Sequence, residues 1–193
     1  ASASPTALSL SSAVASIVII GLFLWRKWAP ISRHYLQQHP WGVLVWTILA
    51  ALGAILPLQW IYEQLNITVA DNVKQLFDSI LGSRWGYLAL GILAPVAEEL
   101  VFRGAILRCL LAYFNNRLPW IPIVVSALLF GAVHANLAQF VNASTMGLLL
   151  GWLYYRTHSV VPGVIFHWAN NTVAYAMYVL MPDLNDGQLI DLF

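Results

Sequence analysis

The sequence predicts an all-α polytopic membrane protein, a bundle of about six transmembrane helices plus a short amphipathic helix. Hydrophobic residues make up 60% of the 193 residues and charged residues only 9%, whereas about a quarter of the residues in a typical soluble domain are charged. The chain also contains nine tryptophans, a residue type that is enriched where hydrocarbon meets lipid headgroups. This composition excludes an ordinary water-soluble protein and indicates that lipid is the main solvent.

The first two predicted spans cover residues 7–25 and 41–62. Neither stretch contains Asp, Glu, Lys or Arg, and each has about the 20 residues that a helix needs to cross a bilayer. The first stretch could instead be a signal-peptide core, but it is long for that role and no basic residue precedes it. Pro57 lies inside the second span, where we expect it to kink the helix rather than end it.

The middle of the chain predicts a surface helix followed by the third span. The stretch "VKQLFDSIL", residues 73–81, has apolar residues at helical spacing within a polar region, which is typical of a helix lying on the membrane surface. The third span covers residues 85–114 and contains Pro95 together with the charges discussed below.

The last three spans follow from a long stretch without charge. Residues 118–155 contain no Asp, Glu, Lys or Arg, and this stretch is too long for one span. The polar segment "HANLAQFVNAS" divides it into spans at residues 119–135 and 140–155, and a sixth span covers residues 160–181. Because there is no repeat or linker, we predict a single membrane domain, residues 1–193.

Basic residues gather at one end of the predicted spans, as expected for cytoplasmic loops, which are rich in Lys and Arg. Lys74 and Arg84 fall at the other end with most acidic residues. Both ends of the chain are then non-cytoplasmic, in an integral multi-pass protein of a bacterial inner membrane or, alternatively, a thylakoid or other organellar membrane. The basic residues near or after the ends of the first, third and fifth spans are Arg26, Lys27, Arg33, Arg108, Arg117 and Arg156.

Other partners and cofactors find little support in the sequence. The formal net charge is +1, and without a basic run there is no argument for nucleic acid as a partner. Cys109 is the only cysteine, so neither an internal disulfide nor a cysteine-based zinc site is possible. The sequence therefore predicts no nucleic-acid partner and no cysteine-based metal site, and we expect no cofactor.

Three charges remain at membrane depth, on Glu98, Glu99 and Arg103. A charge at the bilayer centre costs about 3 kcal/mol on insertion scales, so such groups normally face a protein interior or a wet cavity. Glu99 and Arg103 are four residues apart, so they lie on one helix face and are expected to form an ion pair. Glu98 is rotated by about 100° from Glu99 and is therefore free to point into a cavity.

Two histidines inside predicted spans extend this polar set. His167 and Asn171 in "HWANN" are four residues apart and point to one side of the sixth span, as do Phe130 and His134 of "FGAVH" on the fourth. If the spans converge, a carboxylate, two imidazoles and an amide meet. Such a set suits hydrolysis, which needs a base for water and donors for the oxyanion formed on a carbonyl.

The motifs "EELVFR", "FGAVH" and "HWANN" resemble the EExxxR, FxxxH and HxxxN motifs of the CAAX protease and bacteriocin-processing (CPBP) family of intramembrane glutamic proteases. The resemblance covers a motif-bearing core of about residues 85–181, with each anchor residue present and in order. Better-known family members have eight spans and cleave the last three residues from prenylated CAAX proteins, whereas this sequence predicts six.

The resemblance implies a role for each motif residue in a metal-free peptide hydrolysis. Glu98 and His134 would activate the attacking water, and His167 and Asn171 would stabilise the oxyanion. Glu99, Arg103 and Phe130 would support the site. The implied partner is a membrane-associated protein or peptide substrate within the lipid bilayer.

Three alternatives remain open at this point. Two histidines and a carboxylate can hold zinc or iron(II), and Glu98, His134 and His167 offer such a set, although the sequence has no HExxH. Some relatives act without catalysis, as membrane scaffolds that bind partner proteins within a membrane complex. Buried Glu and His residues also occur in proton-coupled transporters, although the sequence shows no paired halves.

Overall fold

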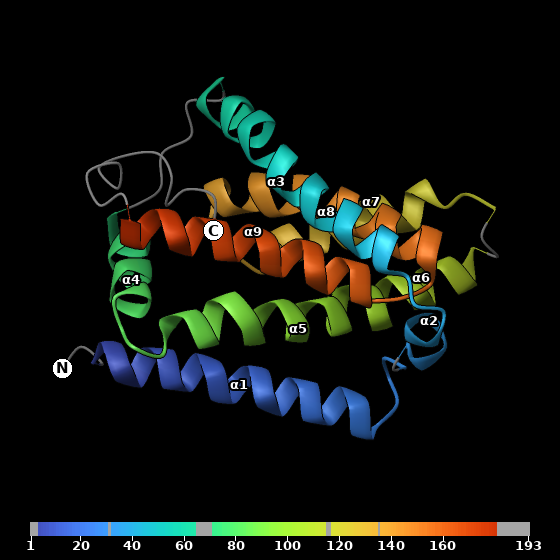
Figure 1. Ribbon diagram of the computed structural model, residues 1–193, viewed down its shortest axis with the longest axis horizontal. Helices are drawn as coiled ribbons and strands as arrows, with labels where there is room; N and C mark the ends of the chain where they lie inside the picture. Colours follow the sequence, from blue (N-terminus) through green and yellow to red (C-terminus); the bar gives the residue numbers. More distant parts are fainter. Residues whose placement is uncertain (1–3, 31, 65–70, 115–116, 135, 181–193) are drawn as a thin grey trace.

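The computed structural model describes residues 4–30, 32–64, 71–114, 117–134 and 136–180, and this part of the chain contains no strand. The predicted all-α fold is confirmed. The helices form an elongated bundle with α4 at one end and α2 and α6 at the other (Figure 1). They are α1 (Pro5–Trp25), α2 (Arg33–Gln37), α3 (Trp41–Gln64), α4 (Asp71–Leu81), η1 (Tyr87–Leu93), α5 (Ala94–Glu99), η2 (Leu100–Leu107), α6 (Arg108–Tyr113), α7 (Trp120–Ala132), α8 (Leu137–Thr157) and α9 (Val161–Leu180).

The observed helices follow the predicted elements with small differences at their ends. The short helix α2 was not predicted, because five residues are too few for a periodic pattern to register. Helix α3 continues through Pro57. The amphipathic stretch begins two residues earlier than expected, at Asp71.

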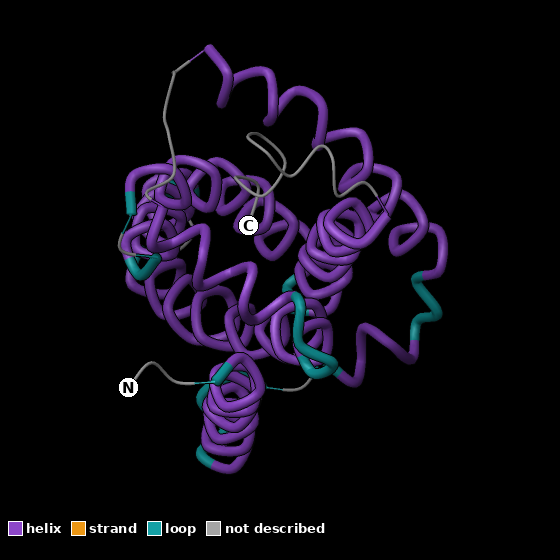
Figure 2. The backbone as a smooth tube through the Cα atoms, turned by 90° about the vertical axis from the view of Figure 1, so that its left-hand side faces the viewer, coloured by secondary structure: helices purple, strands orange, loops and turns teal. Residues whose placement is uncertain are grey.

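Helix α1 packs against the third span at the edge of the bundle, as the view along the bundle shows (Figure 2). Its buried residues are the small Ser9, Ala13 and Ser16, which allow close approach of two helix backbones. The hydroxyls of Ser9 and Ser83 lie 2.6 Å apart in a buried hydrogen bond. The opposite face of α1 is exposed and apolar, with Val14 and Ile17 more than half exposed.

The third span is one continuous helical stretch whose hydrogen bonding changes along its length. The segments η1 and η2 are π-helical and flank α5, which carries both glutamates. Pro95 lies in the first turn of α5 and has no N–H to donate to the preceding turn. π-helical turns are rare and occur often at functional sites, so this irregular helix marks the region of the glutamates.

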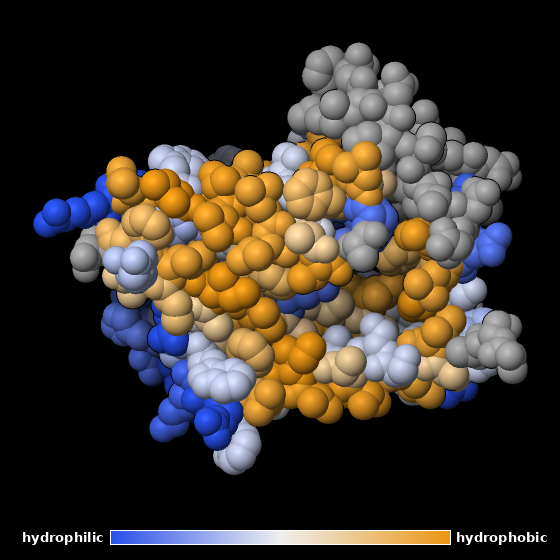
Figure 3. All heavy atoms as spheres, turned by 180° about the vertical axis from the view of Figure 1, so that it is seen from behind, coloured by the Kyte–Doolittle hydropathy of each residue, from blue (hydrophilic) through white to orange (hydrophobic). Residues whose placement is uncertain are grey.

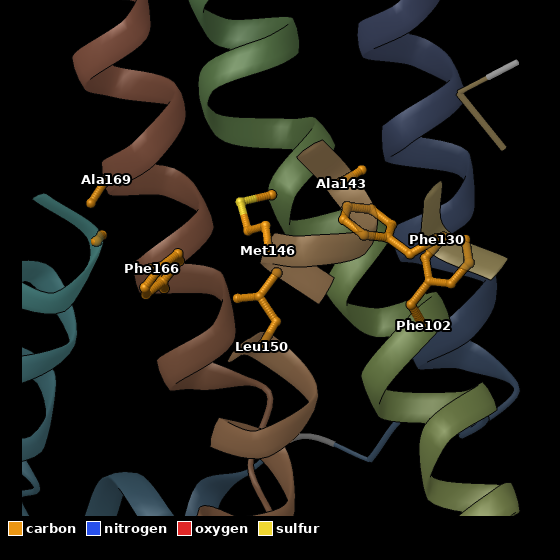
Figure 4. Packing of buried hydrophobic residues seen from close by; sticks show 8 residues of the cluster. Phe102, Phe130, Ala143, Met146, Leu150, Phe166 and Ala169 are labelled. Atoms are coloured by element: carbon orange, nitrogen blue, oxygen red, sulfur yellow. The ribbon is translucent and has the colours of Figure 1, made fainter. Parts of the chain in front are cut away.

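The core lies between the third span and helices α3, α7, α8 and α9. Phe102 and Phe130 meet at a ring separation of 5.1 Å, and Phe166 and Leu150 are almost fully buried nearby (Figure 4). This packing sets the separation of the helices that bear the polar residues. The cluster contains Ala51, Phe102, Phe130, Ala143, Met146, Leu150, Phe166 and Ala169.

Apolar side chains also dominate the outer surface. They cover most of the described face in Figure 3, whereas hydrophilic residues gather mainly toward the left-hand end of that view, where α2 and α6 lie. Trp46 is 72% exposed and Val18 60% exposed, as expected for side chains that contact lipid. By length and composition, α1 is the one helix among the described residues that meets the criteria for a membrane span. The count of six spans therefore stays a prediction.

Candidate active site

Glu98, His134, His167 and Asn171 all line one pocket of about 130 Å³. They come from α5, the end of α7 and α9, so helices distant in sequence bring them together. One water needs about 10–15 Å³ of such space, so the pocket has room for a catalytic water. The full lining comprises Phe77, Leu90, Ala94, Glu98, Phe130, His134, Gln139, Asn142, Ala143, Met146, His167 and Asn171.

The two adjacent glutamates have different surroundings. The side chain of Glu98 is 32% exposed, whereas that of Glu99 is fully buried. Successive residues on a helix point about 100° apart, so one carboxylate reaches the pocket while the other faces the protein interior. Glu98 is thus the glutamate that a substrate or a water molecule in the pocket can reach.

Glu99 and Arg103 form the ion pair that their spacing predicts, with Oε1 of Glu99 2.8 Å from Nη1 of Arg103. The guanidinium also donates to the Gly147 carbonyl at 3.3 Å and lies 4.5 Å from the ring centroid of Phe130. Both charges are buried, so each depends on these contacts in place of water. The ion pair thereby connects η2 to α7 and α8.

His167 lies between the two glutamates. Its Nε2 is 3.7 Å from Oε2 of Glu98, and its Nδ1 is 3.5 Å from Oε1 of Glu99. Sequence reasoning did not foresee this position, because it paired Glu99 with Arg103 alone. The imidazole ring of His167 therefore lies between the exposed carboxylate of Glu98 and the buried ion pair of Glu99 and Arg103.

His134 lies at the end of α7, where its Nδ1 is 2.9 Å from the carbonyl oxygen of Phe130. A carbonyl can only accept, so Nδ1 carries the proton and Nε2 of the neutral ring is an acceptor. Phe130 itself is fully buried, and its ring packs edge-on against both His134 and His167. Phe130 thereby holds the two imidazoles in place through apolar contact.

The side-chain amide of Asn171 is oriented by two hydrogen bonds. Its Nδ2 donates to the Leu90 carbonyl at 3.0 Å, and its Oδ1 accepts from Nδ2 of Asn170 at 3.3 Å. Because the oxygen already has a donor, the amide has a defined orientation beside the pocket. The neighbouring Asn170 thereby supports the orientation of Asn171.

Sequence reasoning missed several residues of the pocket. Asn136 accepts from the Gln139 amide N–H at 2.9 Å and donates to the His134 carbonyl at 3.0 Å, so it caps α8 beside the site. Gln139 and Asn142 also line the pocket. Gln139 and Asn142 are three residues apart at the start of α8, and this helical spacing could have indicated that both side chains lie on one face. Phe77 reaches the pocket from α4, outside every motif.

Within the described part of the chain, no three His, Cys, Asp or Glu side chains are grouped as metal ligands would be. Glu98 and His167 lie close together, whereas His134 approaches the pocket from the end of α7.

Gly163 provides a first test of how tightly the buried ion pair is packed. A Cβ atom at this position would lie 2.6 Å from Oε2 of Glu99, and Arg103 holds that carboxylate in place. We expect Gly163→Ala to destabilise the protein by about 1–3 kcal/mol, the usual cost of overpacking, measured by denaturant unfolding in detergent. Gly53→Ala is the control, since its Cβ would meet nothing within 4 Å. Equal stability of the two variants would contradict the expectation.

The chain is similar to one described protein family and to two curated proteins. Residues 80–173 match the family described as type II CAAX prenyl endopeptidase Rce1-like. The chain is 24% identical over 140 residues to "UPF0177 protein YbdI" of Lactococcus lactis, covering 72% of this chain and 74% of that protein. It is 27% identical over 108 residues to "Putative membrane peptidase YdiL" of Bacillus subtilis, covering 56% of this chain and 43% of that protein.

No solved structure matches the chain. The family match begins at residue 80 and ends at residue 173, and it contains each residue that the motifs place at the pocket. Together with the similarity to a putative membrane peptidase and the helical fold, this match supports the resemblance of the chain to the CPBP family of membrane proteases.

Proposed function

We propose that this protein is an intramembrane endopeptidase that hydrolyses a peptide bond of a membrane-associated substrate by a metal-independent glutamate mechanism. The proposal is carried by one observation, the meeting of Glu98, His134, His167 and Asn171 at a single small pocket. Hydrolysis needs a base, a water molecule and donors for an oxyanion, and these four side chains supply the base and the donors.

The first step is attack by water on the scissile carbonyl. Glu98 and His134 bind the water, and Glu98 accepts its proton as the oxygen forms a bond to the carbonyl carbon. Because Nδ1 of His134 donates to the Phe130 carbonyl, its Nε2 is oriented to accept from the same water. This bond directs a lone pair of the water oxygen toward the carbonyl.

The second step is collapse of the tetrahedral intermediate. His167 and Asn171 donate hydrogen bonds to the oxygen that has become negative. Such donors stabilise the negative charge most strongly in a site that excludes water. The bond between carbon and nitrogen then breaks, and Glu98 returns the proton to the leaving amine. The ion pair of Glu99 and Arg103 keeps the third span in register with α7 and α8 throughout.

Asn171 offers a direct test of the oxyanion role. We expect Asn171→Ala to lower kcat by about 10²–10³-fold, the usual effect of removing one oxyanion donor, with a small change in KM. Asn170→Ala is the control, since it removes only the amide that orients Asn171 and should cost about tenfold or less. Kinetics on a cleaved peptide measure both, and an equal loss in the two variants would argue against a direct contact with the oxyanion.

The substrate can be sought together with the activity. Membranes that contain the wild-type protein are compared with membranes that contain the Glu98→Gln variant, and new peptide termini are identified by mass spectrometry. Termini that appear only with the wild type support proteolysis and name the substrate. Identical termini, together with full rescue of a deletion strain by the variant, would favour a non-catalytic scaffold instead.

A further inference from the structure

A second pocket lies at the other end of the bundle, away from α4. It has a volume of about 190 Å³ and lies between α6 and the end of α8. It shares no residue with the pocket around Glu98, and the proposed peptidase mechanism does not use it. Its lining combines cationic, phenolic and apolar side chains, namely Arg108, Leu111, Ala112, Tyr154 and His158.

Arg108 supplies a fixed positive charge in this pocket. Its Nε donates to the Gly104 carbonyl at 2.9 Å, and its Nη2 donates to the Trp28 carbonyl at 2.7 Å. These bonds use two of the five N–H groups of the guanidinium, which leaves three N–H groups to bind a ligand. The ion pairs among the described residues all involve Glu98 or Glu99, so no described carboxylate neutralises Arg108.

Tyr154 and His158 add further polar groups beside this charge. Tyr154 is buried and lines the pocket. His158 ends α8 in a left-handed conformation with φ of 49°, and its backbone N–H donates to the Tyr154 carbonyl at 2.7 Å. This backbone conformation at the C-cap fixes the direction in which the His158 side chain leaves α8. A guanidinium, a phenol and an imidazole on one pocket match the oxygen atoms of a phosphate group.

The surroundings of the pocket indicate where that phosphate comes from. Leu111 and Ala112 form an apolar wall, and the adjacent Tyr113 is 80% exposed, as expected for an aromatic ring at the membrane interface. The same end of the bundle carries the basic residues that follow the first, third and fifth predicted spans. Basic pockets between helices on the cytoplasmic side are typical binding sites for anionic lipid headgroups.

We propose that the pocket around Arg108 binds the phosphate group of an anionic phospholipid, with Tyr154 and His158 as additional donors and with the start of an acyl chain against Leu111. Bound lipid would link α6 to α8. It would also reinforce the attachment of α1, because Arg108 donates to the Trp28 carbonyl just after that helix.

The test measures binding of three probes to the purified full chain by native mass spectrometry, with phosphatidylglycerol, phosphatidylcholine and inorganic phosphate titrated separately. We expect tight binding of one phosphatidylglycerol and weaker binding of phosphatidylcholine. Arg108→Gln should weaken phosphatidylglycerol binding about tenfold. His158→Asn, which retains a residue suited to the left-handed cap, should weaken it about threefold.

Arg156→Gln is the matched control, since Arg156 is an exposed arginine near the same end of α8 that does not line the pocket. Binding in this variant should stay within twofold of the wild type. Equal weakening by Arg108→Gln and Arg156→Gln would overturn the proposal in favour of general charge attraction, and no weakening by Arg108→Gln would overturn it outright.

The phosphate titration and two further variants test the lipid assignment independently. Inorganic phosphate that binds as tightly as phosphatidylglycerol, with the same dependence on Arg108, would overturn the assignment to a lipid. If Arg108→Gln does not fold, Tyr154→Phe and His158→Asn carry the test, because neither removes the bond to Trp28. Unchanged binding in both of these variants would then overturn the proposal.

Discussion

Replacement of Glu98 by glutamine is expected to lower kcat for peptide hydrolysis by about 10²–10⁴-fold, the range that a positioned general base contributes. Glutamine has the shape of glutamate but cannot accept a proton from water. Since Glu98 is one-third exposed and lies outside the buried ion pair, we expect stability to change by about 1 kcal/mol or less. Loss of rate without loss of fold would identify a chemical role for this carboxylate.

The measurement is single-turnover cleavage of a peptide in proteoliposomes, with unfolding followed in parallel. Asp78→Asn is the matched control, because it neutralises a carboxylate on α4, at the same end of the bundle, that does not line the pocket. We expect this control to retain most of the wild-type activity, because Asp78 does not line the pocket. Wild-type rates in Glu98→Gln would rule out the glutamate mechanism.

Replacement of Arg103 by methionine is expected to reduce the free energy of unfolding by about 3–5 kcal/mol, the cost of breaking a buried ion pair from one side. Glu99 is fully buried, and without Arg103 its carboxylate would lose the guanidinium at 2.8 Å and keep only the His167 ring at 3.5 Å. Its Oε2 already has no hydrogen-bond partner among the described residues. The loss should appear as a lower denaturant midpoint in detergent.

A second substitution distinguishes this cause from simple loss of packing. The double variant Glu99→Leu/Arg103→Met removes both charges, and it should recover most of the lost stability, because apolar replacements of buried ion pairs are often nearly neutral. Arg156→Met is the control, since Arg156 is exposed on α8, and it should change stability by about 0.5 kcal/mol or less. A double variant as unstable as Arg103→Met alone would show that the paired charges are not the cause.

The helices of this protein could be predicted well from the sequence, for local reasons. Apolar length located α1, α3 and α9, and apolar spacing located the amphipathic helix α4. The four-residue spacing of Glu99 and Arg103 predicted their contact, because both lie on the same helix and helix geometry alone decides their separation. The charge-free stretch after Leu118 could be divided correctly because a polar segment interrupts it.

The site could be predicted only in part. The sequence indicated that Glu98, His134, His167 and Asn171 needed an interior position, since lipid is a costly environment for each. The sequence did not indicate that His167 lies between the two glutamates. It also did not indicate that Phe77 of α4 lines the pocket. The roles of these side chains in catalysis stay predictions until the variants are measured.

Hydropathy and helical periodicity, both properties of neighbouring residues, were enough to establish that this chain is a helical membrane protein and to show which face of each helix is polar. Tertiary structure alone decided which polar faces meet, that the third span departs from regular α-helix on both sides of α5, and that a second pocket forms around Arg108. The physical reason is that distances between helices depend on how distant side chains such as Phe102, Phe130 and Phe166 fill the space between them, and no local pattern encodes that packing.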